Sequence, residues 1–143
     1  MTRLKIDAVS KQFGSLTALD NVSLSLEAGH SLALIGPTAA GKSVLLKLIV
    51  GLYGSEQGRL LIDGEAVGDS GARSDAMNAR IGMLFQQNAL FDSLPVWENI
   101  AFRPIAYGMA RDEARALAET MLPSVGLPVT TADLYPADLS GGM

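Results

Sequence analysis

The chain has 143 residues, no cysteine, 48% apolar residues, 18% charged residues and a formal net charge of −4. This length fits one compact domain, and the composition is typical of a globular protein, because disordered chains have fewer apolar and more charged residues. The lack of cysteine excludes disulfides, thiolate catalysis and thiolate metal sites, and the acidic balance argues against nucleic acid as a partner.

The single histidine argues against histidine-based metal or catalytic sites, and the hydropathy pattern argues against a secreted or membrane-spanning protein. His30 follows a turn at 27–29 and is too isolated for a multi-histidine metal site or a serine-type triad, so we expect a solvated turn histidine. No apolar run approaches the roughly 18 residues of a spanning helix, and charges interrupt the N-terminus. We therefore expect a chain that is neither secreted nor integral to a membrane, with any membrane role passing through a partner.

Alternating apolar residues near the N-terminus predict strands over 3–9 and 22–26, with a turn at 13–15 between them. The apolar residues on one face of each strand are Leu4, Ile6 and Ala8, followed by Val22, Leu24 and Leu26. A short apolar strand is expected over 31–35. It is followed by a helix over 43–50 that is apolar nearly all round, and we expect that helix to be buried.

Strands dominate the first half of the chain and helices the second. The next predicted elements are a strand over 59–63, a surface loop over 68–75, a short helix over 76–80 and a strand over 81–85. Two helices follow, over 96–102 and 111–122, separated by Pro104 and Gly108. Ser140 then reads as the N-cap of a helix that has no room to continue, so we expect a truncated chain.

One segment matches the phosphate-binding P-loop pattern G-x-x-x-x-G-K-[ST], between a predicted strand and a predicted helix. Its residues are Gly36, Pro37, Thr38, Ala39, Ala40, Gly41, Lys42 and Ser43. Glycines let the backbone amides converge on an anion, the lysine supplies charge for the β- and γ-phosphates, and the serine hydroxyl suits Mg²⁺. The alternative is a plain glycine-rich turn. A lysine at the start of the helix disfavours this alternative, because its charge interacts unfavourably with the helix dipole, at a cost of about 0.3–1 kcal/mol.

The P-loop, the Gln86 that follows 81–85, and the segment Leu139, Ser140, Gly141 and Gly142 together resemble the ATP-binding subunit of an ABC transporter. The resemblance covers essentially the whole chain. It implies an α/β P-loop NTPase of the ABC type, incomplete, with an N-terminal antiparallel β part, the P-loop strand and helix, and an α-helical subdomain. The implied domains are a partial nucleotide-binding core over 1–88, the helical subdomain over 89–139 and the start of the signature helix at 140–143.

The resemblance also implies roles for single residues, with ATP and Mg²⁺ as cofactors. Phe13, in the segment 11–14, stacks on adenine, and Gln86 meets Mg²⁺ and the attacking water. Residues 139–142 bind the γ-phosphate held by a second ATP-binding subunit in a head-to-tail dimer. The plainer alternatives are packing of Phe13 beside the first strand, a solvated loop end at Gln86, and a bare turn at Ser140.

A narrower resemblance, over 84–94 and 96–102, is to the ATPase subunits of MCE-associated (Mla-type) transporters, which move phospholipids across the bacterial envelope. The resemblance to ABC transporters implies a cytoplasmic subunit, peripheral on the inner face of the plasma membrane, with transmembrane permease subunits contacting the chain between Gln87 and Trp97. The apolar residues of that expected groove are Leu90, Phe91, Leu94 and Trp97. A plain hydrophobic core explains most of them equally well.

The sequence departs from the family pattern in two ways. Ala39 stands where relatives usually carry glycine, which costs on the order of 1–2 kcal/mol if φ is positive. The strand ending in Asp-Glu and the switch histidine do not occur, so we expect these residues alone to bind ATP weakly or not at all and to hydrolyse it negligibly.

The sequence leaves two hypotheses for the function: an ABC ATPase subunit, or a non-catalytic remnant that acts as a binding module. A small kinase or GTPase is disfavoured, because no Asn-Lys-x-Asp segment occurs.

Overall fold

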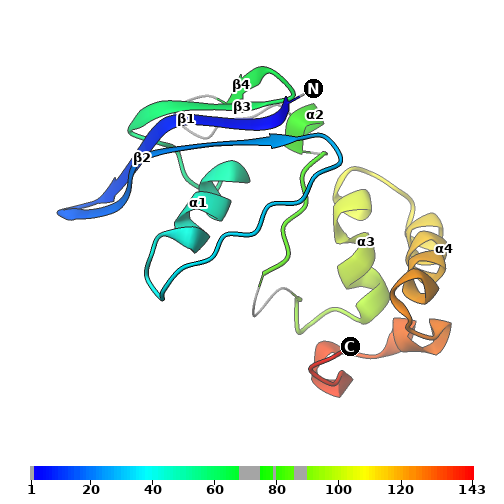
Figure 1. Cartoon of the computed structure of the whole chain (residues 1–143). Helices are drawn as coiled ribbons and strands as arrows, with labels where there is room; N and C mark the ends of the chain where they lie inside the picture. The colour runs from blue at the N-terminus through cyan, green and yellow to red at the C-terminus, as the bar shows by residue number, and fades with distance from the viewer. Residues whose placement is uncertain (1, 68–74, 79, 86–89) are drawn as a thin grey trace. The chain divides into compact units, whose positions relative to one another are not determined.

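The computed structural model describes residues 2–67, 75–78, 80–85 and 90–143. The chain forms two compact units, Met1–Met83 and Leu84–Met143, and each is described by itself. Strands belong to the first unit and the longer helices of the chain to the second (Figure 1). This division follows the change of character that the sequence pattern predicts.

The first unit contains an antiparallel sheet of four strands in the order β2-β1-β3-β4. The strands are β1 (Thr2–Phe13), β2 (Leu16–Glu27), β3 (Gln57–Ile62) and β4 (Glu65–Val67). β1 and β2 form a long hairpin in which Phe13 pairs with Leu16 across the turn. The predicted strands over 3–9, 22–26 and 59–63 are confirmed, whereas β4 has no counterpart among the predicted elements.

A bulge in β1 changes which residue faces the core. Simple alternation places Ala8 beside Ile6, but the register shifts between Ile6 and Val9, and Ala8 has φ 53°. Val9 is fully buried instead, and Ala8 is exposed. The Ser23 hydroxyl accepts a hydrogen bond of 2.9 Å from the Ala8 amide, so the irregular backbone keeps a partner.

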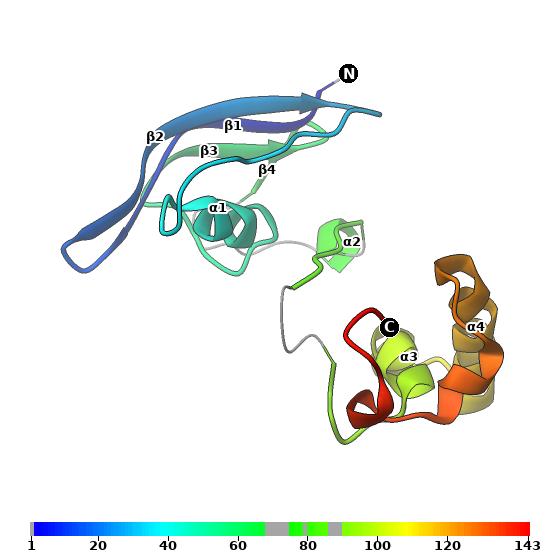
Figure 2. The same cartoon turned by 60° about the horizontal axis from the view of Figure 1, so that its bottom comes forward.

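The helix α1 (Lys42–Ile49) lies against one face of the sheet (Figure 2). It is amphipathic rather than buried all round, because Leu45 and Leu48 are only 5% and 3% exposed while Leu46 is 45% exposed. The core of the unit combines sheet and helix residues: Ile6, Val9, Leu19, Leu45, Leu48, Leu60, Ile62 and Met77, the last from the short helix α2 (Asp75–Asn78). Burial of these side chains therefore fixes α1, and the loop before it, against the hairpin.

Two predicted strands are not formed. Segments 31–35 and 81–85 join no ladder within the described part of the chain, and Ile35 and Leu84 are 94% and 92% exposed. The expected P-loop strand is therefore wrong for this structure. The physical reason is that a strand requires hydrogen bonds to a neighbouring strand. A segment of apolar residues with high β-propensity forms no strand where that neighbour is missing.

The second unit is helical. It contains α3 (Val96–Ala106) and α4 (Arg111–Met121), which lie side by side (Figure 1), followed by the 3₁₀ turns η1 (Leu122–Val125), η2 (Val129–Asp133) and η3 (Pro136–Asp138). The helix α3 runs through Pro104 instead of ending before it, contrary to the prediction. Pro104 lies in the last turn, where the missing amide costs the helix a single hydrogen bond.

Small residues let the two helices approach closely. Ala101, Ala114 and Ala118 are completely buried, together with Leu122 at 1% exposure and Trp97 at 8%. After Ser140 the chain makes a turn, closed by a 2.9 Å hydrogen bond from the Met143 amide to the Ser140 carbonyl, so the expected helix start is not formed. Within the described ranges no helix combines the length and apolar character needed to cross a bilayer.

Candidate functional site

A pocket of about 320 Å³ lies in the first unit, where the hairpin end meets the start of α1. Its lining residues are Phe13, Leu16, Thr17, Ala18, Ala39, Ala40, Gly41, Lys42, Ser43 and Val44. The pocket therefore brings together the predicted adenine-stacking residue and the second half of the predicted phosphate-binding loop. Thr38 lies in the same exposed loop but outside this lining.

Lys42 folds back over the loop that precedes it. Its Nζ donates hydrogen bonds of 2.8 Å to the Gly36 carbonyl and 2.6 Å to the Pro37 carbonyl. These two acceptors offset the unfavourable placement of a cation at a helix N-terminus. A lysine ammonium has three donors, so holding two carbonyls leaves it the capacity to bind an anionic acceptor at the loop.

Gly41 makes the turn from the loop into α1. It is the N-cap, with φ 82°, and its carbonyl accepts the first helical hydrogen bond from Leu45 at 2.9 Å. A Cβ at this position would lie 2.5 Å from the Ala18 carbonyl oxygen, so only glycine lets the loop pass this close to β2. Because glycine has no side chain to cap the helix, the first amides of α1 are the natural partners of an anion.

Ala39 carries backbone strain at the tip of the loop. Its φ is 64°, in the left-handed region that non-glycine residues rarely adopt. The departure noted in the sequence therefore has the structural consequence expected for it, at a cost of about 1–2 kcal/mol. Lys42 binds the carbonyls of Gly36 and Pro37 in the same loop, so Ala39 lies between anchored residues.

Phe13 stands at the turn end of the hairpin, where it pairs with Leu16, and is 41% exposed. Its ring lies 5.3 Å from the ring of Tyr53, at an interplanar angle of 71°, and Lys11 Nζ is 5.3 Å from its centroid. An exposed ring beside the loop can stack on a flat heterocycle, as aromatic side chains do on nucleic-acid bases. Packing beside the strand thus describes only part of the surroundings of Phe13.

Two further residues, Tyr53 and Glu56, surround Phe13, and neither is among the residues predicted from the sequence. The Glu56 carboxylate accepts hydrogen bonds from Lys11 Nζ at 2.6 Å and from the Gln12 amide at 3.0 Å. The hydrogen bond from Lys11 lowers the pKa of the exposed Glu56 carboxyl below its ordinary value. Lys11 and Glu56 are 45 residues apart, and no local pattern in the sequence links them.

The second unit carries the other predicted site residues. Leu139 packs against its hydrophobic core, and Ser140, Gly141 and Gly142 form the exposed terminal turn. Their predicted role toward a partner's nucleotide stays a prediction. Gln86 and Gln87 lie outside the described residues, so the role of Gln86 also stays a prediction.

The predicted permease-contacting segment divides into exposed and buried parts. Leu90 and Phe91 are 46% and 50% exposed, whereas Trp97 is a core residue, with the guanidinium of Arg111 5.1 Å from its ring. Trp97 is therefore a packing residue in this structure. The plain-core alternative holds for it, because its ring packs in the core that the two helices share and the arginine lies over the ring.

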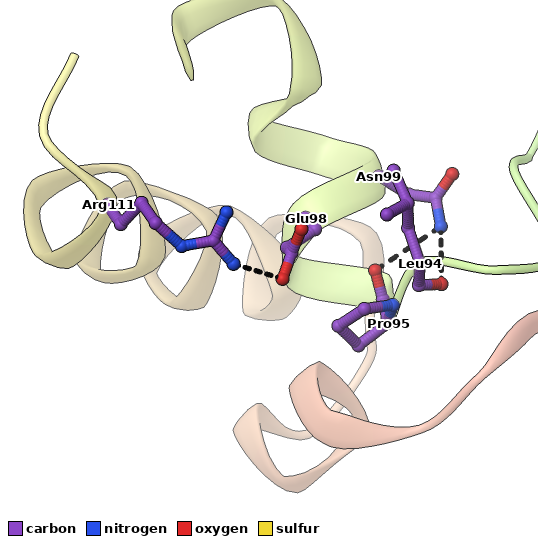
Figure 3. A network of polar contacts seen from close by, with 5 residues as sticks. All are labelled: Leu94, Pro95, Glu98, Asn99 and Arg111. Atoms are coloured by element: carbon purple, nitrogen blue, oxygen red, sulfur yellow. Dashed lines mark hydrogen bonds and ion pairs between the residues drawn. The ribbon is translucent and has the colours of Figure 1, made fainter.

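Asn99 holds the turn that precedes α3 (Figure 3). Its side-chain amide donates to the carbonyls of Leu94 at 2.9 Å and Pro95 at 3.2 Å, and its Oδ1 accepts from the Phe91 amide at 2.7 Å. Figure 3 also shows the ion pair between Glu98 and Arg111, which joins α3 to the start of α4. The exposed Phe91 is thus carried on a rigid turn.

The described residues contain no group of three or more histidine, aspartate or glutamate side chains able to hold a metal ion. Mg²⁺ in phosphate sites uses few protein ligands and relies on phosphate oxygens and water. Ser43, exposed in the first turn of α1 beside the loop, fits that donor set. The residues present therefore fit a magnesium-bound triphosphate better than a metal held by protein carboxylates.

Comparisons with known proteins agree with this geometry. The sulfate/thiosulfate import ATP-binding protein CysA of Synechococcus elongatus is 40% identical over 139 residues, which are 97% of this chain and 39% of that protein. The glutamine transport ATP-binding protein GlnQ of Escherichia coli is 39% identical over 135 residues, which are 94% of this chain and 56% of that protein. The chain therefore spans roughly two fifths to just over half of the length of these relatives.

Solved structures give the same result. The structure titled "Dimeric Structure of MJ0796, a Bacterial ABC Transporter Cassette" superposes with a TM-score of 0.81 at 28% identity, over 96% of this chain and 63% of that one. A second structure of the same cassette, in a post-hydrolysis state bound to ADP and Pi, gives a TM-score of 0.79. The expected fold class, an ABC-type P-loop NTPase, is confirmed by these likenesses. Residues 19–143 match the family described as ABC transporter, and the chain belongs to that family.

Proposed function

We propose that this chain is the nucleotide-binding part of an ABC transporter ATPase, which binds Mg-ATP with the loop at 36–43. The observation that carries this proposal is the pocket shared by Phe13 and the residues from Ala39 to Ser43. It pairs an exposed aromatic ring with a loop and helix start suited to phosphate, which are the two chemically distinct parts of a nucleotide. Both features line a single pocket, as the two ends of one bound nucleotide require.

Each part of the pocket has a separate task in this proposal. The amides after Gly41 and the Lys42 ammonium hold the phosphates, Ser43 contributes a hydroxyl ligand to Mg²⁺, and Phe13 stacks on the base. Bound Mg²⁺ neutralises charge on the phosphates. To bind phosphate, Lys42 gives up part of its hold on the Gly36 and Pro37 carbonyls, which is a reason to expect weak affinity.

The remaining parts of the function concern the whole transporter. We propose that a second ATP-binding subunit faces this one head to tail and contacts 139–142, and that the family's ATP hydrolysis drives transport in the assembled protein. Transmembrane permease subunits would contact the segment between Gln87 and Trp97, where Leu90 and Phe91 are exposed, and hold the chain at the inner face of the membrane. By itself the chain is expected to hydrolyse ATP negligibly.

The transported substrate is a separate question. CysA and GlnQ are named for sulfate or thiosulfate import and for glutamine transport. These names give no support to the phospholipid substrate suggested by residues 84–94, which stays a prediction. The substrate is therefore not part of the proposal for the pocket.

The proposal is tested by following backbone amide resonances while millimolar Mg-ATP is added to the chain. We expect the amides of 36–43 to shift in the wild type, because the loop and the start of α1 contact the phosphates. Lys42→Ala should abolish those shifts at the same concentration, and Lys5→Ala, which removes an exposed lysine of β1 outside the pocket lining, should leave them. Shifts confined to other residues, or equal shifts in the wild type and Lys42→Ala, would refute it.

A further inference from the structure

The end of the hairpin that carries Phe13 extends beyond the rest of the sheet. The pairing of β1 with β3 ends at Ser10 and Gln57, so the last residues of β1 have only β2 as a strand neighbour. A two-stranded ribbon is a weak support on its own. The orientation of Phe13 therefore depends on what else contacts this end of the hairpin.

The segment that follows α1 supplies these contacts. Glu56 binds β1 three times: its amide donates to the Ser10 carbonyl at 3.1 Å, and its carboxylate accepts from Lys11 and from the Gln12 amide. These contacts fix the backbone immediately before Phe13. Tyr53, three residues before Glu56, packs on the Phe13 ring itself.

Tyr53 also contacts the helix that begins at the phosphate-binding loop. Lys47 Nζ, on α1, lies 5.7 Å from the centroid of the Tyr53 ring, and the Leu52 amide donates to the Lys47 carbonyl at 2.8 Å. A continuous series of contacts thus runs from α1 through Tyr53 to Phe13. The tilted, edge-on geometry of the two rings is the one that aromatic pairs prefer, so it restricts how Phe13 can turn.

We infer that Tyr53 is a positioning residue for the nucleobase: it holds the Phe13 ring in a stacking orientation relative to the phosphate-binding loop. This inference rests on the proposed function and extends it to a residue outside the phosphate-binding pattern and outside the lining of the pocket. Tyr53 acts through Phe13, so it affects the base and leaves phosphate binding alone. Its effect arises because a restrained side chain loses less conformational freedom when a ligand binds.

The test compares two probes, Mg-ATP and inorganic tripolyphosphate, which lacks the base. Tyr53→Leu keeps apolar volume but removes the ring, and we expect it to weaken Mg-ATP binding by about three- to tenfold, the usual effect of freeing one side chain. Binding of tripolyphosphate should be unchanged. Tyr53→Phe keeps the ring and should behave as the wild type.

A matched control is Leu52→Ala, because Leu52 is adjacent to Tyr53 and 55% exposed. It should leave the affinity for both probes unchanged. A cooperative thermal unfolding transition establishes that each variant is folded. If Tyr53→Leu does not fold, Tyr53→Ala serves as a second variant without the ring.

The possible results separate the inference from the function on which it rests. If the wild type binds neither probe, the proposed function is refuted and the inference falls with it. If the wild type binds both probes, the inference alone is refuted by three results: unchanged Mg-ATP affinity in Tyr53→Leu, an equal loss for both probes, or failure of Tyr53→Phe to bind as the wild type does. An equal loss for both probes would mean that Tyr53 only supports the local fold.

Discussion

The two glycines of the loop at 36–43 differ in how much space surrounds them for a side chain, and substituting each by alanine tests this difference. At Gly41 an added Cβ would lie 2.5 Å from the Ala18 carbonyl oxygen and 3.0 Å from a methyl group of Leu19, on a backbone with φ 82°. At Gly36 the Cβ would meet, among the residues that the structure describes, only the Ala40 Cβ, at 3.6 Å, which is ordinary van der Waals contact.

The expected magnitudes follow from these contacts. At Gly41, a left-handed backbone costs alanine about 1–2 kcal/mol, and overpacking against a rigid strand costs about 1–3 kcal/mol more. Gly41→Ala should therefore destabilise the first unit by roughly 2–5 kcal/mol, which lowers Tm by at least about 8 °C for a unit of this size. Gly36→Ala should remain within about 1 kcal/mol of the wild type, since nothing must move to admit its methyl group.

Thermal unfolding followed by circular dichroism, with urea unfolding at 25 °C as a second measurement, compares the two variants directly. Both add one methyl group to the same loop, so general effects of the substitution cancel. If Gly41→Ala and Gly36→Ala unfolded at the same temperature, the close approach of the loop to β2 would be refuted. Equal unfolding temperatures would also mean that the start of α1 does not require glycine at position 41.

Three further predictions concern the loop, the α3 turn and the Lys11 ion pair. Ala39→Gly should raise Tm by a few degrees. It removes about 1–2 kcal/mol of left-handed backbone strain, and this gain exceeds the additional conformational-entropy cost of folding a glycine, about 0.5–1 kcal/mol. Asn99→Ala should cost about 1–3 kcal/mol in urea unfolding and speed hydrogen exchange at the Phe91 amide, which loses its acceptor. Because the folded-state pKa of Glu56 is lowered, its pair with Lys11 stabilises at neutral pH and is lost on acidification through that pKa. The stability difference between wild type and Glu56→Gln should therefore vanish in acid.

The strands were predictable where their pattern is local. Alternation over 3–9 and 22–26 was sufficient to locate the two strands of the hairpin, because period-two burial leaves a direct trace in the sequence. It failed at Ala8, where a bulge moves Val9 into the core, and bulges leave no comparable trace. The apolar run over 31–35 wrongly predicted a strand, because apolar residues form a strand only where a neighbouring strand pairs with them.

The candidate site divides in the same way. The residues from Gly36 to Ser43 could be proposed as a site from their order alone, since a loop that wraps an anion draws its glycines, lysine and serine from one short stretch. Phe13 could be identified only through the family resemblance. Tyr53 and Glu56 could not be identified, because their contacts with β1 join residues about forty positions apart and exist only when the sheet has formed.

Local order was thus enough to predict the helix α1 and to propose phosphate binding by the loop before it, because the chemistry of such a loop is carried by consecutive residues. Three-dimensional packing added what consecutive residues cannot specify. It set the backbone strain at Ala39, the approach of Gly41 to Ala18, and the ring of Tyr53 against Phe13. Each of these depends on a hairpin, a helix and the segment after it meeting in space, and their meeting is decided by the burial of a shared core.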